Sequence, residues 1–170
     1  TIVDTDDQIR LIKNICKAEN IDIKQISPRY VLAILDKWKN KGFYPSEVKI
    51  NPKDIYEKTI LPVYKIYQQK LTELNACDFG DLILHSVKIL EKNKDIRNIY
   101  SKNFKYILVD EYQDTNFIQS RWLNLLAEKN EDIRKIYSKN FKYILVDEYQ
   151  DTNFIQNKWL NLIVNKKKNI

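Results

Sequence analysis

Hydrophobic and polar positions follow the period of an α-helix through the first half of the chain. In the first stretch, apolar side chains recur every three or four positions behind a group of Asp and Thr residues that can cap a helix, which predicts a helix over about residues 6–19. Ser27 and Pro28 form a typical helix start. The apolar stripe that follows them, ending with Trp38, predicts a second helix over about residues 28–41.

Two further helices are predicted before residue 92. The first of them is predicted by apolar side chains at helical spacing, namely Val63, Ile66, Tyr67, Leu71 and Leu74. Pro62 is expected to kink or break the first part of this segment, because proline lacks a backbone N–H and clashes with the preceding turn. Asp78 is placed to cap the next helix, whose apolar stripe follows directly. The pattern up to this point is therefore helical throughout.

The pattern changes at residues 106–109, where the apolar run Tyr-Ile-Leu-Val is continuous. A short run of β-branched and aromatic residues bounded by charge is typical of a strand buried on both faces. The run ends in Asp110 and Glu111, and Asp114 or Thr115 can cap a following helix, so the segment has the form of half an α/β unit. The apolar face of that helix is expected to carry Ile118, Trp122 and Leu125.

One segment of the chain occurs twice. Residues 91–126 recur as residues 128–163, so the string ILVDEYQDTN appears at 107–116 and again at 144–153. Solenoid arrays need about three or more repeats, so two nearly identical copies indicate a recent in-frame duplication or an assembly error. The second string is therefore not independent evidence of a function. The copies differ at Lys94/Glu131, Asn98/Lys135, Ser120/Asn157, Arg121/Lys158 and Leu126/Ile163.

The charge balance favours a polyanionic partner. Lys and Arg outnumber Asp and Glu by 29 to 23, which gives a net charge of +6. The alternative is a solvated basic surface, because the lysines are spread along the chain rather than concentrated. Trp38 and the Tyr-rich segment 56–67 are in phase with the apolar stripes, so we expect them in the core rather than stacked on bases.

Several other kinds of site are not supported. Cys16 and Cys77 lack CxxC spacing and His85 is the only histidine, so neither a zinc site nor a disulfide framework is indicated, and both cysteines are expected to be core residues. No apolar run reaches the length of a membrane span, and no signal-peptide pattern opens the chain. The expected location is therefore the cytoplasm, with no membrane partner.

The acidic string carries a family resemblance. Two acids after an apolar run are a weak sign of catalysis by themselves, although ligands of open parallel sheets bind beyond the carboxyl ends of the strands. The whole string VDEYQDTN closely resembles the Walker B or DExx motif of the UvrD/PcrA/Rep-like superfamily 1 DNA helicases. Upstream, DTDDQIRLIK, SPRYVLAILDKWKNKG and LNACDFGDLILHSVKIL resemble the helical insertion in the first motor domain of that family. Family members more often carry an acid at the position of Gly80.

The resemblance implies a mainly α fold, with one or two short parallel β-strands from an incomplete RecA-like P-loop NTPase α/β domain. It implies a helical insertion subdomain at residues 1–92, a Walker B strand and helix at 93–130, and a tandem copy of that segment at 131–170. In a purely structural alternative, strands 105–110 and 142–147 pair in parallel through a right-handed crossover, which would hide strand edges.

The resemblance also implies residue roles. Asp110 would be the Mg²⁺ ligand and Glu111 the general base for ATP hydrolysis, while Gln113 and Asp114 complete the motif. The equivalent residues of the second copy are Asp147, Glu148, Gln150 and Asp151. The implied partner is DNA, as a single strand or at a duplex junction. The helical insertion of this family lies near the DNA, so phosphate contacts are implied for Arg29, Lys37, Lys39 and Lys41.

The sequence lacks a phosphate-binding loop of the form GxxxxGK[ST]. Gly42 and Gly80 are the only glycines, neither is followed by GK, and we find none of the later motifs of the family. We therefore expect ATP and Mg²⁺ to bind tightly and turn over in a longer parent protein rather than in these residues alone.

The ends of the sequence fit a slice of such a parent. The chain begins at Thr1 without any Met and ends one strand before the next family motif. The chain is therefore expected to be a fragment of an ATP-dependent 3′ to 5′ DNA helicase. The alternative is a non-enzymatic helical module that binds DNA or protein, or a gene remnant. DNA repair and replication restart both stay open as roles.

Overall fold

The computed structural model describes residues 1–104, 109 and 114–127, and most of these residues are helical. The chain divides into a first unit, Thr1–His85, and a second unit, Ser86–Ile170. Two β-strands of two residues each, which pair in parallel, accompany the helices. The prediction of a mainly α fold with short parallel strands is therefore confirmed, although this pair lies elsewhere in the chain than the predicted strands.

Helices α1 and α2 begin at the residues that the sequence predicts. Helix α1 spans Thr5–Ala18, and the carboxylate of Asp4 accepts a hydrogen bond from the backbone N–H of Asp7 at 2.9 Å. Helix α2 spans Pro28–Asn40, and the hydroxyl of Ser27 accepts a backbone N–H of the first turn at 3.2 Å. Each cap satisfies a donor that has no partner within its helix.

Helix α3 spans Ile55–Glu73 and continues through Pro62. Of the predicted kink or break at Pro62, the break is therefore wrong, and the kink stays a prediction. A proline at this position removes the hydrogen bond to the carbonyl of Lys58. Both residues are exposed, so water can solvate that carbonyl. The helix starts earlier than predicted because the side chain of Asp54 caps it, accepting a first-turn N–H at 3.0 Å.

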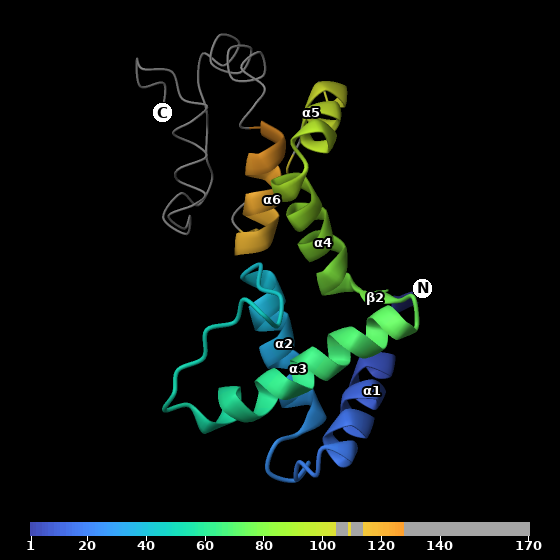
Figure 1. Ribbon diagram of the computed structural model, residues 1–170, viewed down its shortest axis with the longest axis vertical. Helices are drawn as coiled ribbons and strands as arrows, with labels where there is room; N and C mark the ends of the chain where they lie inside the picture. Colours follow the sequence, from blue (N-terminus) through green and yellow to red (C-terminus); the bar gives the residue numbers. More distant parts are fainter. Residues whose placement is uncertain (105–108, 110–113, 128–170) are drawn as a thin grey trace. The chain divides into compact units, whose positions relative to one another are not determined.

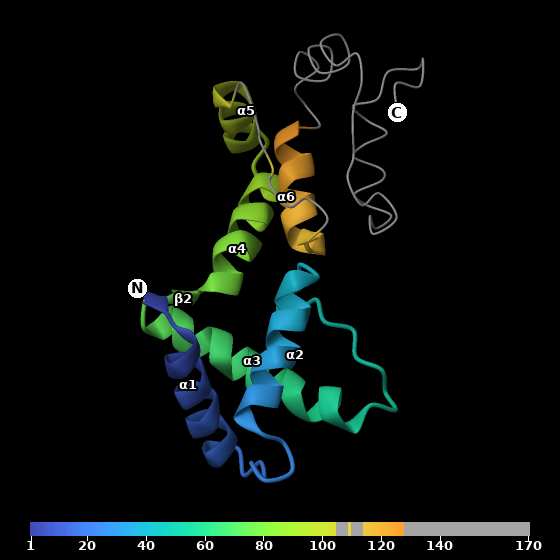
Figure 2. The same cartoon turned by 180° about the vertical axis from the view of Figure 1, so that it is seen from behind.

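The core of the first unit lies where α3 crosses α1 and α2 (Figures 1 and 2). Trp38 is 4% exposed and stacks on Tyr64 with ring centroids 5.7 Å apart, so its predicted place in the core is confirmed. Cys16 is buried as predicted, whereas Cys77 is half-buried. The buried core consists of Ile12, Ile15, Cys16, Val31, Leu32, Leu35, Trp38, Ile60, Val63, Tyr64, Tyr67 and Leu71.

The first unit also contains two short strands. Strand β1, Ile2–Val3, pairs in parallel with strand β2, Cys77–Asp78. Asn75 precedes β2 with a φ of 47°, a left-handed conformation that Asn tolerates better than most residues, and it turns the chain out of α3. The sequence did not predict these strands, because two residues show no period.

Helix α4, Phe79–Lys92, starts in the first unit and continues into the second. The second unit also contains α5, Lys94–Asn103, and α6, Phe117–Ala127. Helix α6 was predicted, but its cap is neither Asp114 nor Thr115. The side chain of Asn116 accepts the backbone N–H of Gln119 at 3.0 Å, and the Gln119 side chain accepts the N–H of Asn116 at 2.9 Å, which is a capping box.

Helix α5 has no counterpart among the predicted elements. In α6, Ile118 and Leu125 are buried as expected, whereas Trp122 is 37% exposed. Apart from Val109, the predicted strand 105–110 lies outside the described residues, as do the second copy at 131–170 and the predicted pairing of the two strands. Among the helices that the structure describes, none is long and apolar enough to cross a membrane.

Candidate functional site

The predicted acidic motif lies almost wholly outside the part of the chain that the structure describes. Asp110, Glu111 and Gln113 are outside it, and so is the equivalent set Asp147, Glu148, Gln150 and Asp151 of the second copy. Asp114 is described and is exposed ahead of α6. The roles of these residues therefore stay predictions.

The four basic residues predicted to contact DNA separate into two groups. Arg29, Lys37 and Lys41 are exposed, and their spacing places them within about a third of the circumference of α2. Lys39 is only 1% exposed. It lies two positions from both Lys37 and Lys41, about 200° around the helix, and therefore faces inward. Lys39 is thus not available to a phosphate in this structure.

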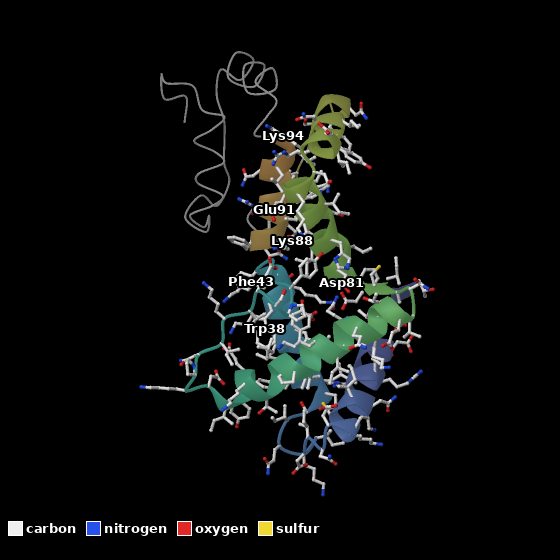
Figure 3. All side chains as sticks on the ribbon, in the orientation of Figure 1. Trp38, Phe43, Asp81, Lys88, Glu91 and Lys94 are labelled. Carbon is white, nitrogen blue, oxygen red and sulfur yellow. The ribbon has the colours of Figure 1, made fainter. Side chains whose placement is uncertain are left out.

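The ammonium of Lys39 is bound by two buried carboxylates. Its Nζ pairs with Oδ2 of Asp78, and it lies 2.8 Å from Oδ1 of Asp81. All three side chains are 1% exposed, so the ions have left water completely. Figure 3 shows Asp81 in the first turn of α4. The cluster of Lys39, Asp78 and Asp81 therefore ties the start of α4 to α2.

Neutral side chains from α1 and α3 complete this cluster. The hydroxyl of Tyr67 donates to Oδ2 of Asp78 at 2.8 Å and accepts from the amide of Gln8 at 3.1 Å. The amide of Gln68 donates to Oδ1 of Asp81 at 3.1 Å. Buried polar groups cost free energy unless they are hydrogen-bonded, so these contacts help the ions to remain inside the protein.

The two aspartates also cap α4. The backbone N–H of Asp81 donates to Oδ1 of Asp78 at 2.9 Å, and the N–H of Asp78 donates to Oδ2 of Asp81 at 3.2 Å. This is the reciprocal arrangement of a capping box, formed here by two aspartates. All four carboxylate oxygens therefore have a partner, and the predicted capping role of Asp78 is confirmed.

The pKa values in the cluster depend on the position of one cation, Lys39, between two anions, Asp78 and Asp81. Burial by itself raises the pKa of Asp78, but the charge and hydrogen bonds of Lys39, followed by those of Asp81 and Tyr67, outweigh it and hold that pKa below its usual value. Burial and the nearby carboxylates raise the pKa of Tyr64 and Tyr67. The two tyrosines are therefore neutral hydrogen-bonding groups at physiological pH.

Gly80 lets α4 approach α2 closely. A Cβ atom at this position would lie 3.0 Å from Cδ of Lys39 and 3.3 Å from Oδ1 of Asp78. Since Lys39 is held by two ion pairs, it has little freedom to move away. Gly80 is thus packed tightly against the buried lysine.

A second polar contact lies beside the cluster. The hydroxyl of Tyr44 is 2.7 Å from Nδ1 of His85, and Nε2 of His85 is 3.9 Å from Oδ1 of Asp81. Within the described ranges, no group of three or more His, Cys, Asp or Glu side chains is arranged to hold a metal ion. The carboxylates of the cluster are already saturated by protein donors, so its geometry suits fixing α4 rather than binding a ligand.

These features describe a helical unit whose last helix leads into the segment that carries the acidic string DEYQDTN. The family model of the UvrD/REP helicase N-terminal domain matches residues 1–136 and, in a second match, residues 126–170. The chain therefore belongs to the UvrD/REP helicase family. The second match covers the whole second copy of the repeat, residues 128–163.

Individual relatives agree with the family. The chain is 38% identical over 128 residues to a probable DNA helicase II homolog of Rickettsia conorii, covering 75% of this chain and 20% of the relative. It is 38% identical over 127 residues to the ATP-dependent DNA helicase PcrA of Staphylococcus epidermidis, covering 75% of this chain and 17% of that helicase. The PcrA of Staphylococcus aureus matches at 37% identity over 127 residues. The chain thus spans about a fifth of the length of these relatives.

Proposed function

We propose that this chain is part of an ATP-dependent 3′ to 5′ DNA helicase, in which ATP hydrolysis drives translocation on single-stranded DNA and duplex unwinding. The observation that carries the proposal is the string DEYQDTN at residues 110–116, inside the segment that the family model matches. The names of the relatives, DNA helicase II and PcrA, support it.

In this proposal the acidic motif of the first copy acts on the nucleotide. Asp110 would hold Mg²⁺ and Glu111 would accept a proton from the attacking water, with Gln113 and Asp114 completing the motif. Bound Mg²⁺ would neutralise the charge that develops on the phosphates. Carboxylates that follow a strand are suitable ligands, because Mg²⁺ prefers oxygen donors and retains several waters.

The first unit would lie against the DNA in this assembly. Arg29, Lys37 and Lys41 are exposed on one side of α2, and phosphate contacts need exposed cations. We leave Lys39 out of this set, because its ammonium is buried between Asp78 and Asp81. The proposed contact surface therefore consists of Arg29, Lys37 and Lys41.

A fluorescence anisotropy titration of the 170-residue chain with a labelled oligo(dT) single strand tests the DNA-binding part of the proposal. In the triple variant Arg29→Ala, Lys37→Ala, Lys41→Ala, affinity is expected to fall. The slope of log affinity against log salt concentration is expected to become shallower by about 2, since each lost phosphate contact on a single strand contributes about 0.7.

The matched control removes the same number of charges elsewhere on the first unit. Lys13, Lys17 and Lys24 are exposed and lie outside α2. Replacing these three by Ala lowers the net charge equally but is expected to leave the salt slope within about 0.5 of the parent chain. Equal slopes for the two triple variants would reject a specific surface on α2 and leave only general attraction to the net positive charge.

The alternative of a non-enzymatic DNA- or protein-binding module makes the same binding prediction, so a second experiment is needed. Sequencing the locus with single reads that span codons 91–170 and their flanks separates the two. An in-frame GxxxxGK[ST] upstream and further helicase motifs downstream support the motor, whereas stop codons on both sides support a remnant that only binds.

A further inference from the structure

Two tyrosines from different helices of the first unit form an exposed aromatic pair. Tyr30 lies in the first turn of α2 and Tyr56 in the first turn of α3, and their ring centroids are 6.0 Å apart at an interplanar angle of 76°. Tyr30 is 44% exposed and Tyr56 is 53% exposed. The prediction that the Tyr-rich segment 56–67 belongs to the core is therefore wrong for Tyr56, although Tyr64 and Tyr67 are buried.

The contact between the two rings leaves aromatic surface accessible. In an edge-to-face contact, one ring uses its edge and the other uses one of its faces, so the remaining faces are not covered by the partner ring. The pair of Trp38 and Tyr64 differs, because these rings stack on each other inside the core. An accessible aromatic face is a surface on which a nucleic-acid base of any identity can stack.

Tyr30 is in line with exposed cations of α2. Because successive residues of a helix are about 100° apart, Lys37 and Lys41 lie within about 20° of Tyr30 around the axis. Lys37 lies about 10 Å from Tyr30 along the axis, and Lys41, which directly follows the helix, about 6 Å further. Arg29, next to Tyr30, is exposed like both lysines. The row therefore combines an aromatic ring at one end with positive charge along its length.

The acidic residues beside Tyr56 are held by backbone donors. Oδ1 of Asp54 accepts the backbone N–H of Glu57 at 3.0 Å, and Oε2 of Glu57 accepts the backbone N–H of Asn51 at 3.4 Å. These hydrogen bonds fix the start of α3 and with it the position of Tyr56. The charge of the two carboxylates repels phosphate, so the phosphates of a bound strand lie closer to the cations of α2 than to Tyr56.

We propose that Tyr30 and Tyr56 stack on a base of single-stranded DNA whose phosphates follow Arg29, Lys37 and Lys41. In a duplex the bases are paired and stacked on one another, so a base reaches the two rings only after it is unpaired. A protein partner would also cover aromatic surface, but three cations beside the pair favour a polyanion. This inference rests on the proposed function, because it names the form of DNA that the surface on α2 binds.

Fluorescence anisotropy with the full 170-residue chain and a labelled oligo(dT) tests the stacking. In the double variant Tyr30→Ala, Tyr56→Ala, affinity is expected to fall by about fivefold or more, the loss that corresponds to one stacked base. The slope of log affinity against log salt concentration is expected to stay unchanged, because neither tyrosine is charged. The double variant Tyr30→Phe, Tyr56→Phe keeps both rings and is expected to bind like the parent chain.

A strand of equal length that carries abasic sites tests the same point without any substitution. It has the phosphates of oligo(dT) but no bases, so the parent chain is expected to bind it about fivefold more weakly or worse. This comparison remains decisive if the alanine variant does not fold. Equal affinity of the parent chain for the two strands would overturn the stacking.

An exposed aromatic pair in the second unit supplies the matched control. Tyr100 is 49% exposed and Phe104 is 41% exposed, and their rings stack with centroids 6.3 Å apart. Replacing both by Ala removes aromatic surface away from the cations of α2, so affinity for oligo(dT) is expected to stay within about twofold of the parent chain. An equal loss in the two alanine variants would overturn a specific role of Tyr30 and Tyr56.

The outcomes separate this inference from the proposed function. If the tyrosine variant binds oligo(dT) as tightly as the parent chain while the triple variant Arg29→Ala, Lys37→Ala, Lys41→Ala has a shallower salt slope, the stacking is rejected and the DNA surface stands. Tighter binding of a duplex of equal length would overturn the preference for a single strand. Absence of measurable binding by the parent chain would reject both proposals and favour a protein partner for the aromatic pair.

Discussion

The first unit and the described part of the second differ in where their ion pairs lie. In the first unit, three helices enclose a core of apolar residues, and the charges of Lys39, Asp78 and Asp81 are paired while buried. In the described part of the second unit, the ion pair between Arg121 and Glu91 is accessible to solvent, with side chains 50% and 29% exposed. Both units leave some large apolar side chains exposed, such as Leu74 at 62% and Ile99 at 57%. The comparison indicates that buried charge contributes to the stability of the first unit, whereas a surface ion pair contributes little to the second.

The largest expected effect comes from breaking the buried cluster of the first unit. In Lys39→Met, Asp78 and Asp81 lose their cation while remaining buried, and removing one partner of a buried ion pair costs about 3–5 kcal/mol. Urea unfolding followed by fluorescence and circular dichroism measures this loss of stability. We expect the midpoint to fall sharply, or the first unit to be unfolded without urea.

The neighbouring Lys37 supplies the matched control. It lies on the same helix but is exposed, so Lys37→Met is expected to change the free energy of unfolding by no more than about 0.5 kcal/mol. Similar midpoints for the two variants would mean that the buried ion pairs contribute little, and their contrast with the surface ion pair of the second unit would lose its main support.

The second unit offers a smaller test within a single helix. Leu125 is 3% exposed and Trp122 is 37% exposed, although both belong to the stripe that the sequence predicts. Leu125→Ala is expected to destabilise by about 2–4 kcal/mol, because it leaves a cavity. Trp122→Ala is expected to cost less than about 1 kcal/mol in urea unfolding. A larger loss for Trp122 would show that this tryptophan is packed in solution.

Lys39 shows which part of the buried cluster could be predicted from the sequence and which part could not. Lys39 follows Leu35 by four residues and Leu32 by seven, so it belongs to the apolar phase of α2. That phase indicated an inward-facing lysine, which needs buried acids as partners. The partners themselves were not predictable by periodicity, because Asp78 and Asp81 come from a distant part of the chain.

The helices of the first unit were predictable because each has a cap and a regular apolar stripe. Ser27 and Asp78 are capping residues at the positions the sequence indicates. The errors fall where local signals conflict with packing. Pro62 is accommodated inside α3, and strands β1 and β2 depend on a pairing between residues far apart in sequence. The candidate acidic site was recognised by its family motif rather than by physical pattern.

The smallest effect on stability is expected at Asp36, a residue of α2 whose pKa is shifted by the charges of the neighbouring cluster. Burial raises the pKa of Asp36, and the carboxylates of Asp78 and Asp81 raise it further while Lys39 lowers it. Since the folded-state pKa lies above the unfolded value of about 3.9, ionised Asp36 destabilises the folded state at neutral pH. This penalty shrinks as the pH falls through the raised pKa and vanishes below the unfolded value.

Asp36→Asn removes this ionisation at nearly constant shape. Unfolding in urea is therefore expected to show that the variant is more stable than the parent chain at pH 7, with a difference that declines steadily between neutral pH and about pH 4. A difference independent of pH would mean that the substitution acts through packing or hydrogen bonding. A variant that is less stable at pH 7 and approaches the parent on acidification would show that Lys39 dominates at Asp36, so that the cluster attracts a further anion in spite of its two carboxylates.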